Sequence, residues 1–268
     1  MTQENLNQFR QQIDTIDNQI IDLLKDRIEI VKQVGEHKKK ASMTQSFIRA
    51  GREANMLRDL TNKIDGKFPA GAIATIWRMI ISSSLSTEQN MSIATFANEK
   101  DNSSYWRARE YFGSFLNIER YNCTDTVIKK IASGETAVGV LPLDNEPWWV
   151  RPKNEKNDIF IFARIPFIEE DSGIPASLAI ANVMPEATDD DISLMSVTTK
   201  STENDILKAF SDNNLTANII ANDKNNNYLI EINKFFDTTN PLINDLEKAL
   251  ADKTKIRLMG AYAVPIAI

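Results

Sequence analysis

The first forty residues constrain the fold most, because they form one uninterrupted amphipathic pattern. No proline, and no glycine before Gly35, interrupts residues 4–40. Apolar residues recur there at intervals of three and four, which is typical of a helix with one apolar face. They are Phe9, Ile13, Ile16, Ile20, Leu23, Leu24, Val31 and Val34. A helix of this length far exceeds the globular average and indicates a bundle or paired helices.

Three cations, Arg10, Arg27 and Lys38, are spaced along this predicted helix. Arg27 and Lys38 are close to three whole turns apart, so they share a face at a separation of roughly 16 Å. Two cations aligned beside an apolar stripe need an anion between them. Arg10 lies roughly 25 Å before Arg27 along the axis and reaches the same ligand only from a second, antiparallel copy of the helix. The spacing therefore indicates an anion site shared between two chains.

The composition bounds the class of protein. The 268 residues suffice for two or three domains, and 42% hydrophobic with 25% charged residues is typical of a soluble protein. A net charge of −6 argues against sequence-independent binding of nucleic acid. No apolar run approaches the roughly 20 residues that span a bilayer. Because the first residues are polar and acidic, unlike a secretory signal, we expect a cytoplasmic protein without nucleic-acid or membrane partners.

The single cysteine and single histidine limit the chemistry further. Cys123 alone excludes an internal disulfide, and His37 alone argues against a zinc site. We find no phosphate-binding loop and no glycine-rich dinucleotide fingerprint. We therefore expect neither a metal nor a cofactor.

The pattern of elements changes at about residue 90. Helices are predicted at residues 4–40, 48–63 and from Pro69 to about residue 89. Residues 91–175 alternate between strand and helix, which indicates an α/β layer. From about residue 190 the order is βαββαβ, the split form of an α/β sandwich. The predicted fold class is thus multidomain α and α/β, with domains at 1–90, 91–175 and 176–268.

Polar residues of the helical third gather on or beside its apolar faces. They are Arg10, Arg27, Lys38, Arg49, Arg52, Glu53, Ser84 and Glu88. Cations outnumber acids here although the whole chain is acidic, which favours a small polyanionic ligand. No nucleophile with a base partner appears among them, so such a site catalyses only through shape and electrostatics.

Residues 5–90 resemble the all-helical class of chorismate mutase, in the form fused to bacterial prephenate dehydratases. The resemblance rests on the cation spacing, on Gly35, on Gly51-Arg52-Glu53 and on the segment IWRMIISSSLSTE. It implies three helices per chain in an intertwined homodimer with two shared sites. It also implies an isomerase of aromatic amino acid biosynthesis that rearranges chorismate to prephenate without covalent catalysis.

The resemblance implies a role for each site residue. Arg27 and the partner subunit's Arg10 bind the two carboxylates of chorismate, and Ser84 hydrogen-bonds a carboxylate. Lys38 donates to the ether oxygen whose bond breaks. Glu53 holds the ring hydroxyl, with Arg52 in support. Glu88 is the second donor to the ether oxygen, which requires its carboxyl to be protonated, so activity should fall as that carboxyl ionises.

The remaining two thirds resemble prephenate dehydratase followed by an ACT regulatory domain. MSIATFANE and GVLPLDNE resemble two strand ends of the dehydratase, but its threonine-arginine-phenylalanine motif is reduced to Ala163-Arg164-Ile165. The tail that ends in KIRLMGAY resembles an ACT domain without its phenylalanine-binding motifs. We therefore predict a shortened dehydratase-like domain and an ACT-like domain, both structural or regulatory.

Two other functions stay open on the sequence. One is a bifunctional mutase–dehydratase, and the other is a non-catalytic metabolite sensor built on an inactive mutase. Trp148 and Trp149 could form an aromatic ligand platform, but packing of their loop onto the domain is the favoured interpretation.

Overall fold

A computed structural model of the chain describes residues 3–40, 48–88, 91–143, 147–150, 159–169, 173–251 and 253–267. The chain divides into two compact units. One comprises residues 1–47 and 83–90, and the other comprises residues 48–82 and 91–268.

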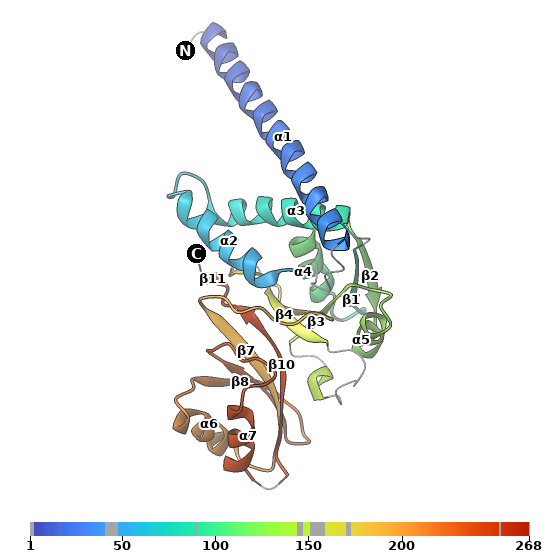
Figure 1. The fold of residues 1–268 in the computed structure, drawn as a ribbon, viewed down its shortest axis with the longest axis vertical. Helices are drawn as coiled ribbons and strands as arrows, with labels where there is room; N and C mark the ends of the chain where they lie inside the picture. Colours follow the sequence, from blue (N-terminus) through green and yellow to red (C-terminus); the bar gives the residue numbers. More distant parts are fainter. Residues whose placement is uncertain are drawn as a thin grey trace. The chain divides into compact units, whose positions relative to one another are not determined.

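The helices follow the sequence pattern closely. They are α1 (Gln3–Lys40), α2 (Ala50–Lys63), α3 (Ala70–Glu88), α4 (Ser103–Phe112), α5 (Thr124–Ala132), α6 (Glu203–Asp212) and α7 (Leu242–Ala249), with a short 3₁₀ turn at Trp148–Val150 (Figure 1). The three helices predicted in the first ninety residues are confirmed. Local chemistry sets some of the ends, because Thr202 and Asp205 form a capping box at the start of α6 and Gly113 ends α4 with a positive φ.

The strands begin after α3. They are β1 (Ser92–Phe96), β2 (Asn117–Tyr121), β3 (Val138–Pro142), β4 (Phe160–Ile165), β5 (Ile168–Glu169), β6 (Ser177–Ala181), β7 (Asp191–Thr198), β8 (Ala217–Asn222), β9 (Asn227–Ile232), β10 (Lys255–Ala263) and β11 (Ile266–Ala267). Short β5 and β11 pair with each other. The longer strands match the predicted alternation, so the mixed α and α/β fold class is confirmed.

Within the described residues, nine strands form one mixed sheet in the order β2-β1-β3-β6-β4-β10-β7-β9-β8. β1 runs parallel to both β2 and β3, while β6 lies antiparallel between β3 and β4. β10 pairs with β7 and also with β4, where Gly260 stands opposite Ile161. The sheet therefore joins the α/β region to the βαββαβ region through β10.

The βαββαβ region consists of β7, α6, β8, β9, α7 and β10, in the predicted order. Its four strands are all antiparallel to their neighbours within the region. The domain boundary predicted at residues 175 and 176 stays a prediction, and β6, which follows it, pairs with β3 and β4.

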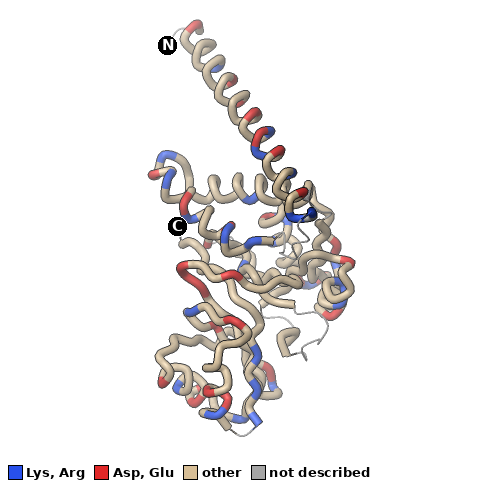
Figure 2. The backbone as a smooth tube through the Cα atoms, viewed as in Figure 1, with Lys and Arg blue, Asp and Glu red and all other residues tan. Residues whose placement is uncertain are grey.

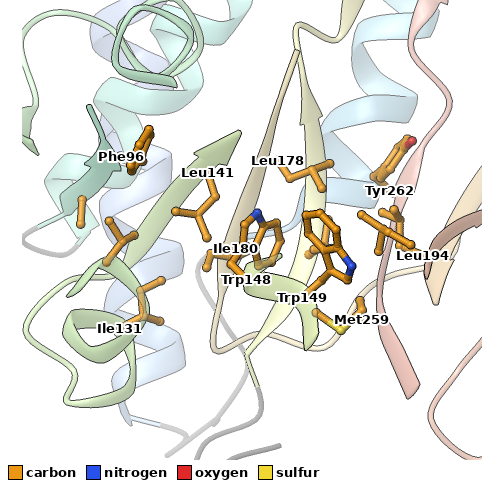
Figure 3. Close-up of a cluster of buried hydrophobic side chains, with 14 residues drawn as sticks. Phe96, Ile131, Leu141, Trp148, Trp149, Leu178, Ile180, Leu194, Met259 and Tyr262 are labelled. Carbon is orange, nitrogen blue, oxygen red and sulfur yellow. The ribbon is translucent and has the colours of Figure 1, made fainter. Parts of the chain in front are cut away.

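Within the described part of the chain, two clusters of buried apolar side chains lie in the core of the sheet. One centres on Trp148 and Trp149, which lie among Leu178, Ile180 and Met259 (Figure 3). Trp148 also donates from Nε1 to the carbonyl oxygen of Pro142 at 2.9 Å. Both indoles are almost completely buried, so the expected packing of these two side chains into the core is confirmed. The second cluster joins α6 and α7 to the sheet, with Phe210 and Phe236 fully buried.

Membrane insertion finds no support in the helices that the structure describes. None of them combines the length and the apolar content that crossing a bilayer requires.

Candidate active site

Arg27 and Ser84 come together within the smaller unit. Arg27 lies on α1, and Ser84 lies in the last turns of α3. The Arg27 guanidinium donates from Nη1 to the Ser84 hydroxyl at 2.5 Å, although 57 residues separate the two along the chain. Ser84 is buried and Arg27 is half-buried. A cation and a hydroxyl from two helices thus lie side by side, an arrangement that suits a carboxylate ligand.

The other predicted residues of this unit lie on the same two helices. Arg10 is exposed on α1, and Lys38 is half-buried near the end of that helix. Both acidic and basic residues are spread along α1 (Figure 2). The backbone of Glu88 ends α3, but its side chain lies outside the described residues.

A long apolar stripe on α1 is exposed in the single chain. It comprises Leu6, Phe9, Ile13, Ile16, Ile20, Leu23, Ile30 and Val34, each between 38% and 67% exposed. Their spacing alternates between three and four residues, and Arg27 fills the vacant position between Leu23 and Ile30. An alternation of three and four is the heptad spacing of helices that pack along their length against another helix.

Glu53 belongs to the larger unit and forms a buried ion pair with Arg78. The Nη1 atom of Arg78, on α3, donates to Oε2 of Glu53, on α2, at 2.7 Å. The two side chains are 8% and 12% exposed. The Arg78 guanidinium carbon also lies 3.8 Å from the centre of the Tyr111 ring, on α4. Glu53 is therefore held by one fixed cation, which in turn lies against an aromatic face.

Arg78 is not among the site residues predicted from the sequence. The signal was present, because Arg78 is the single charged residue of the apolar run AGAIATIWRMII. A cation at such a position needs a buried partner.

Arg52 is exposed next to Glu53 and lines an open groove of about 730 Å³. Arg49 lines the same groove and forms an ion pair with Glu186. The groove contains both signs of charge, since Asp59 and Lys63 lie along it as well.

Helix α2 is held firmly against the start of β7 and the end of β10. Arg58 donates from Nη2 to the carbonyl oxygens of Asp190 and Val264, each at 2.9 Å, and from Nη1 to the hydroxyl of Thr188 at 3.2 Å. Gly51 permits a close approach, because a Cβ there would lie 3.0 Å from the Glu186 Cβ. The βαββαβ region thus fixes the helix that carries Arg52 and Glu53.

The remnant of the dehydratase motif takes part in a surface ion pair. Arg164, on β4, donates from Nη1 to Glu169 Oε1 at 3.0 Å, and both side chains are partly exposed. The other dehydratase-like segment, GVLPLDNE, ends in Asp144, Asn145 and Glu146, which lie outside the described residues. Among the described residues, no cluster of three or more histidine, cysteine or acidic side chains could hold a metal ion.

Comparison with known proteins identifies the helical segment. Residues 9–89 match the model of the family "Chorismate mutase type II". These residues are a chorismate mutase type II domain. The match spans all the candidate residues of the first ninety, from Arg10 to Glu88.

The curated relatives carry the same domain name in a longer protein. The chain is 31% identical over 144 residues to the bifunctional chorismate mutase/prephenate dehydratase of Aquifex aeolicus and 27% identical over 146 residues to that of Stutzerimonas stutzeri. Each match covers 53% of this chain and 40% of the relative. The chain therefore matches about two fifths of the length of these relatives.

Among solved structures, the prephenate dehydratase from Streptococcus mutans is similar with a TM-score of 0.41 and 16% identity. That match covers 66% of this chain and all of the other.

Proposed function

We propose that this chain is a chorismate mutase that rearranges chorismate to prephenate in aromatic amino acid biosynthesis. The observation that carries the proposal is the bond between Arg27 and Ser84 inside the matched domain. A carboxylate between this guanidinium and this hydroxyl would receive charge-assisted hydrogen bonds from both. We infer a cytoplasmic enzyme, supported by a single cysteine, which rules out an internal disulfide.

The proposed reaction needs no nucleophile, because it is intramolecular. The ether C–O bond breaks while a new C–C bond forms, and the atoms of the substrate are all retained. The enzyme contributes by binding the compact chair form and by stabilising charge that develops on the ether oxygen. Lys38 and protonated Glu88 donate to that oxygen, Glu53 with Arg52 holds the ring hydroxyl, and Arg27 with the partner subunit's Arg10 binds the carboxylates.

We propose further that the enzyme works as a homodimer with shared sites. The exposed apolar stripe of α1 supports this, since so many exposed apolar side chains in heptad spacing favour packing against a second helix. A second copy supplies a stripe of the same spacing and, when antiparallel, brings its Arg10 toward the first copy's Lys38.

Mixing two inactive variants tests both the mutase activity and the sharing of each site between two subunits. Arg10→Ala and Lys38→Ala chains should each lose turnover of chorismate. After subunit exchange the mixture should recover about a quarter of wild-type activity, because half of the dimers are mixed and each mixed dimer keeps one intact site. Absence of turnover by the wild-type protein would refute the mutase assignment.

A matched mixture provides the control. Arg27→Ala and Lys38→Ala remove two groups that one chain supplies to one site, so every site in their mixed dimer is defective. This mixture should stay inactive. Equal recovery in both mixtures would contradict a site that takes Arg10 from the partner.

A bifunctional mutase–dehydratase is the second candidate. It is favoured by the names of the relatives and by matches that are longer than residues 9–89. Incubation of the purified protein with prephenate distinguishes the two, because only a dehydratase releases phenylpyruvate and carbon dioxide.

A further inference from the structure

Arg78 is a buried cation whose surroundings come from both the helical and the α/β regions. The residue is 7% exposed on α3. Its guanidinium carbon lies 3.8 Å from the centre of the Tyr111 ring. The same atom lies 5.9 Å from the centre of the ring of Phe167, a residue that follows β4. Tyr111 and Phe167 are themselves buried. The guanidinium is therefore held on two aromatic residues that both belong to the α/β region.

The orientation of the Arg78 side chain costs free energy and serves one particular bond, the one to Glu53. Among the residues that the structure describes, its buried Nε atom has no hydrogen-bond partner, so the side chain is not placed to satisfy all its donors. Instead Nη1 is directed at Oε2 of Glu53 at 2.7 Å. An apolar residue at this position could fill the space without burying a charge. The arrangement is explained if the position of the Glu53 carboxylate matters.

Neither Glu110 nor the Tyr111 phenol competes with Glu53 for Arg78. Glu110 precedes Tyr111 on α4 and lines a small cavity beside Arg78, but its carboxylate is paired with Arg107 at 2.7 Å. Burial raises the pKa of the Tyr111 phenol to about 12, against a smaller lowering by Arg78. The phenol therefore stays neutral at physiological pH and presents its ring face, rather than a phenolate, to the guanidinium.

We propose that Arg78 is a positioning residue for the mutase reaction, held by Tyr111 and fixing the Glu53 carboxylate for the substrate's ring hydroxyl. The inference rests on the proposed mutase function and on the role of Glu53 in it. A glutamate side chain has three rotatable bonds, and a bond to one oxygen restricts them while the second oxygen can accept from the ligand. The α/β region thereby acts on the mutase reaction without contact with the reacting atoms.

A double-mutant cycle on kcat/KM tests the proposal. Arg78→Gln should lower kcat/KM about 10- to 100-fold, since small misplacements of a binding group have effects of this size. The same change in a Glu53→Gln background should lower kcat/KM less than about twofold, because the group that Arg78 positions is already altered. Equal losses in both backgrounds, or no loss in either, would overturn the proposal.

Arg107→Gln is the matched control. Arg107 is also a buried arginine in a 2.7 Å ion pair, but its partner is Glu110. The Arg107→Gln substitution should lower the melting temperature while leaving kcat/KM within about twofold of wild type. A loss of kcat/KM equal to that of Arg78→Gln would mean that any buried arginine of this region has the effect, and would overturn the specific role.

A second pair of variants applies if Arg78→Gln does not fold. Tyr111→Phe keeps the ring face and should retain kcat/KM, whereas Tyr111→Leu should lower it about three- to tenfold, and only where Glu53 is present. Equal kcat/KM for the two variants would overturn the proposal. If the wild-type protein has no mutase turnover, the proposed function fails and this inference fails with it, whereas turnover with additive losses refutes the role of Arg78 alone.

Discussion

Gly260 offers the sharpest test of how the sheet is held together. It lies in β10 at a break in the register with β7, opposite Ile161 of β4, with φ at +139°. A Cβ at this position would lie 2.1 Å from the Ile161 carbonyl oxygen and 2.5 Å from its nitrogen. Because both atoms are backbone atoms, the overlap cannot be relieved by rotating a side chain.

The expected cost of Gly260→Ala follows from two contributions. A non-glycine residue at such a φ costs about 1–3 kcal/mol, and forcing the strands apart costs about 1–3 kcal/mol more. A total near 4 kcal/mol corresponds to a fall in melting temperature of about 8–15 °C for a chain of this size. Thermal unfolding followed by circular dichroism measures this fall.

Gly134→Ala separates the two contributions. Gly134 also has a positive φ, +77°, but a Cβ there would have no neighbour within 4 Å. Only the backbone cost of about 1–2 kcal/mol applies, so the melting temperature should fall by about 3–6 °C. Equal falls for the two variants would refute the reasoning that β10 approaches β4 too closely for any side chain.

Three further predictions concern the proposed dimer, the proposed hydrogen bond from Glu88 to the ether oxygen, and the stability of the fold at alkaline pH. Ile16→Glu places a charge in the apolar stripe of α1 and should convert the proposed dimer to an inactive monomer in light scattering, whereas Asn18→Glu, about half a turn away, should not. Glu88→Gln should flatten the decline of mutase activity with rising pH, because the amide donates at every pH; an unchanged profile would rule out this role. The raised pKa of Tyr111, about 12 against 10.0, contributes stability that is present below pH 10 and lost as pH rises toward 12, so Tyr111→Phe should unfold with a shallower pH dependence in that window.

The sequence predicted the elements well because their signals are local. Apolar spacing located α1, and short apolar runs between turn residues located the strands. The neighbours of each strand could not be predicted in this way. The insertion of β6 between β3 and β4, and the pairing of β10 with both β4 and β7, depend on contacts between residues far apart in the chain.

The residues of the candidate site also divide into those that the sequence could predict and those that it could not. Motif spacing selected Arg27 and Ser84, which lie within hydrogen-bond distance. It missed Arg78, because the selected charges flank apolar faces, whereas Arg78 lies within an apolar face. Its partners, Glu53 and Tyr111, come from two other helices, so no short motif contains all three.

The bonds of Arg58 bear on the order in which the molecule is completed during synthesis. Its partner Val264 is made 206 residues later, after all nine strands of the large sheet. Until Val264, which follows β10, has left the ribosome, the Arg58 guanidinium of α2 lacks one of the two backbone carbonyls that anchor it, the other being that of Asp190. The helix that carries Arg52 and Glu53 is therefore among the first to be synthesised and among the last to reach its final place.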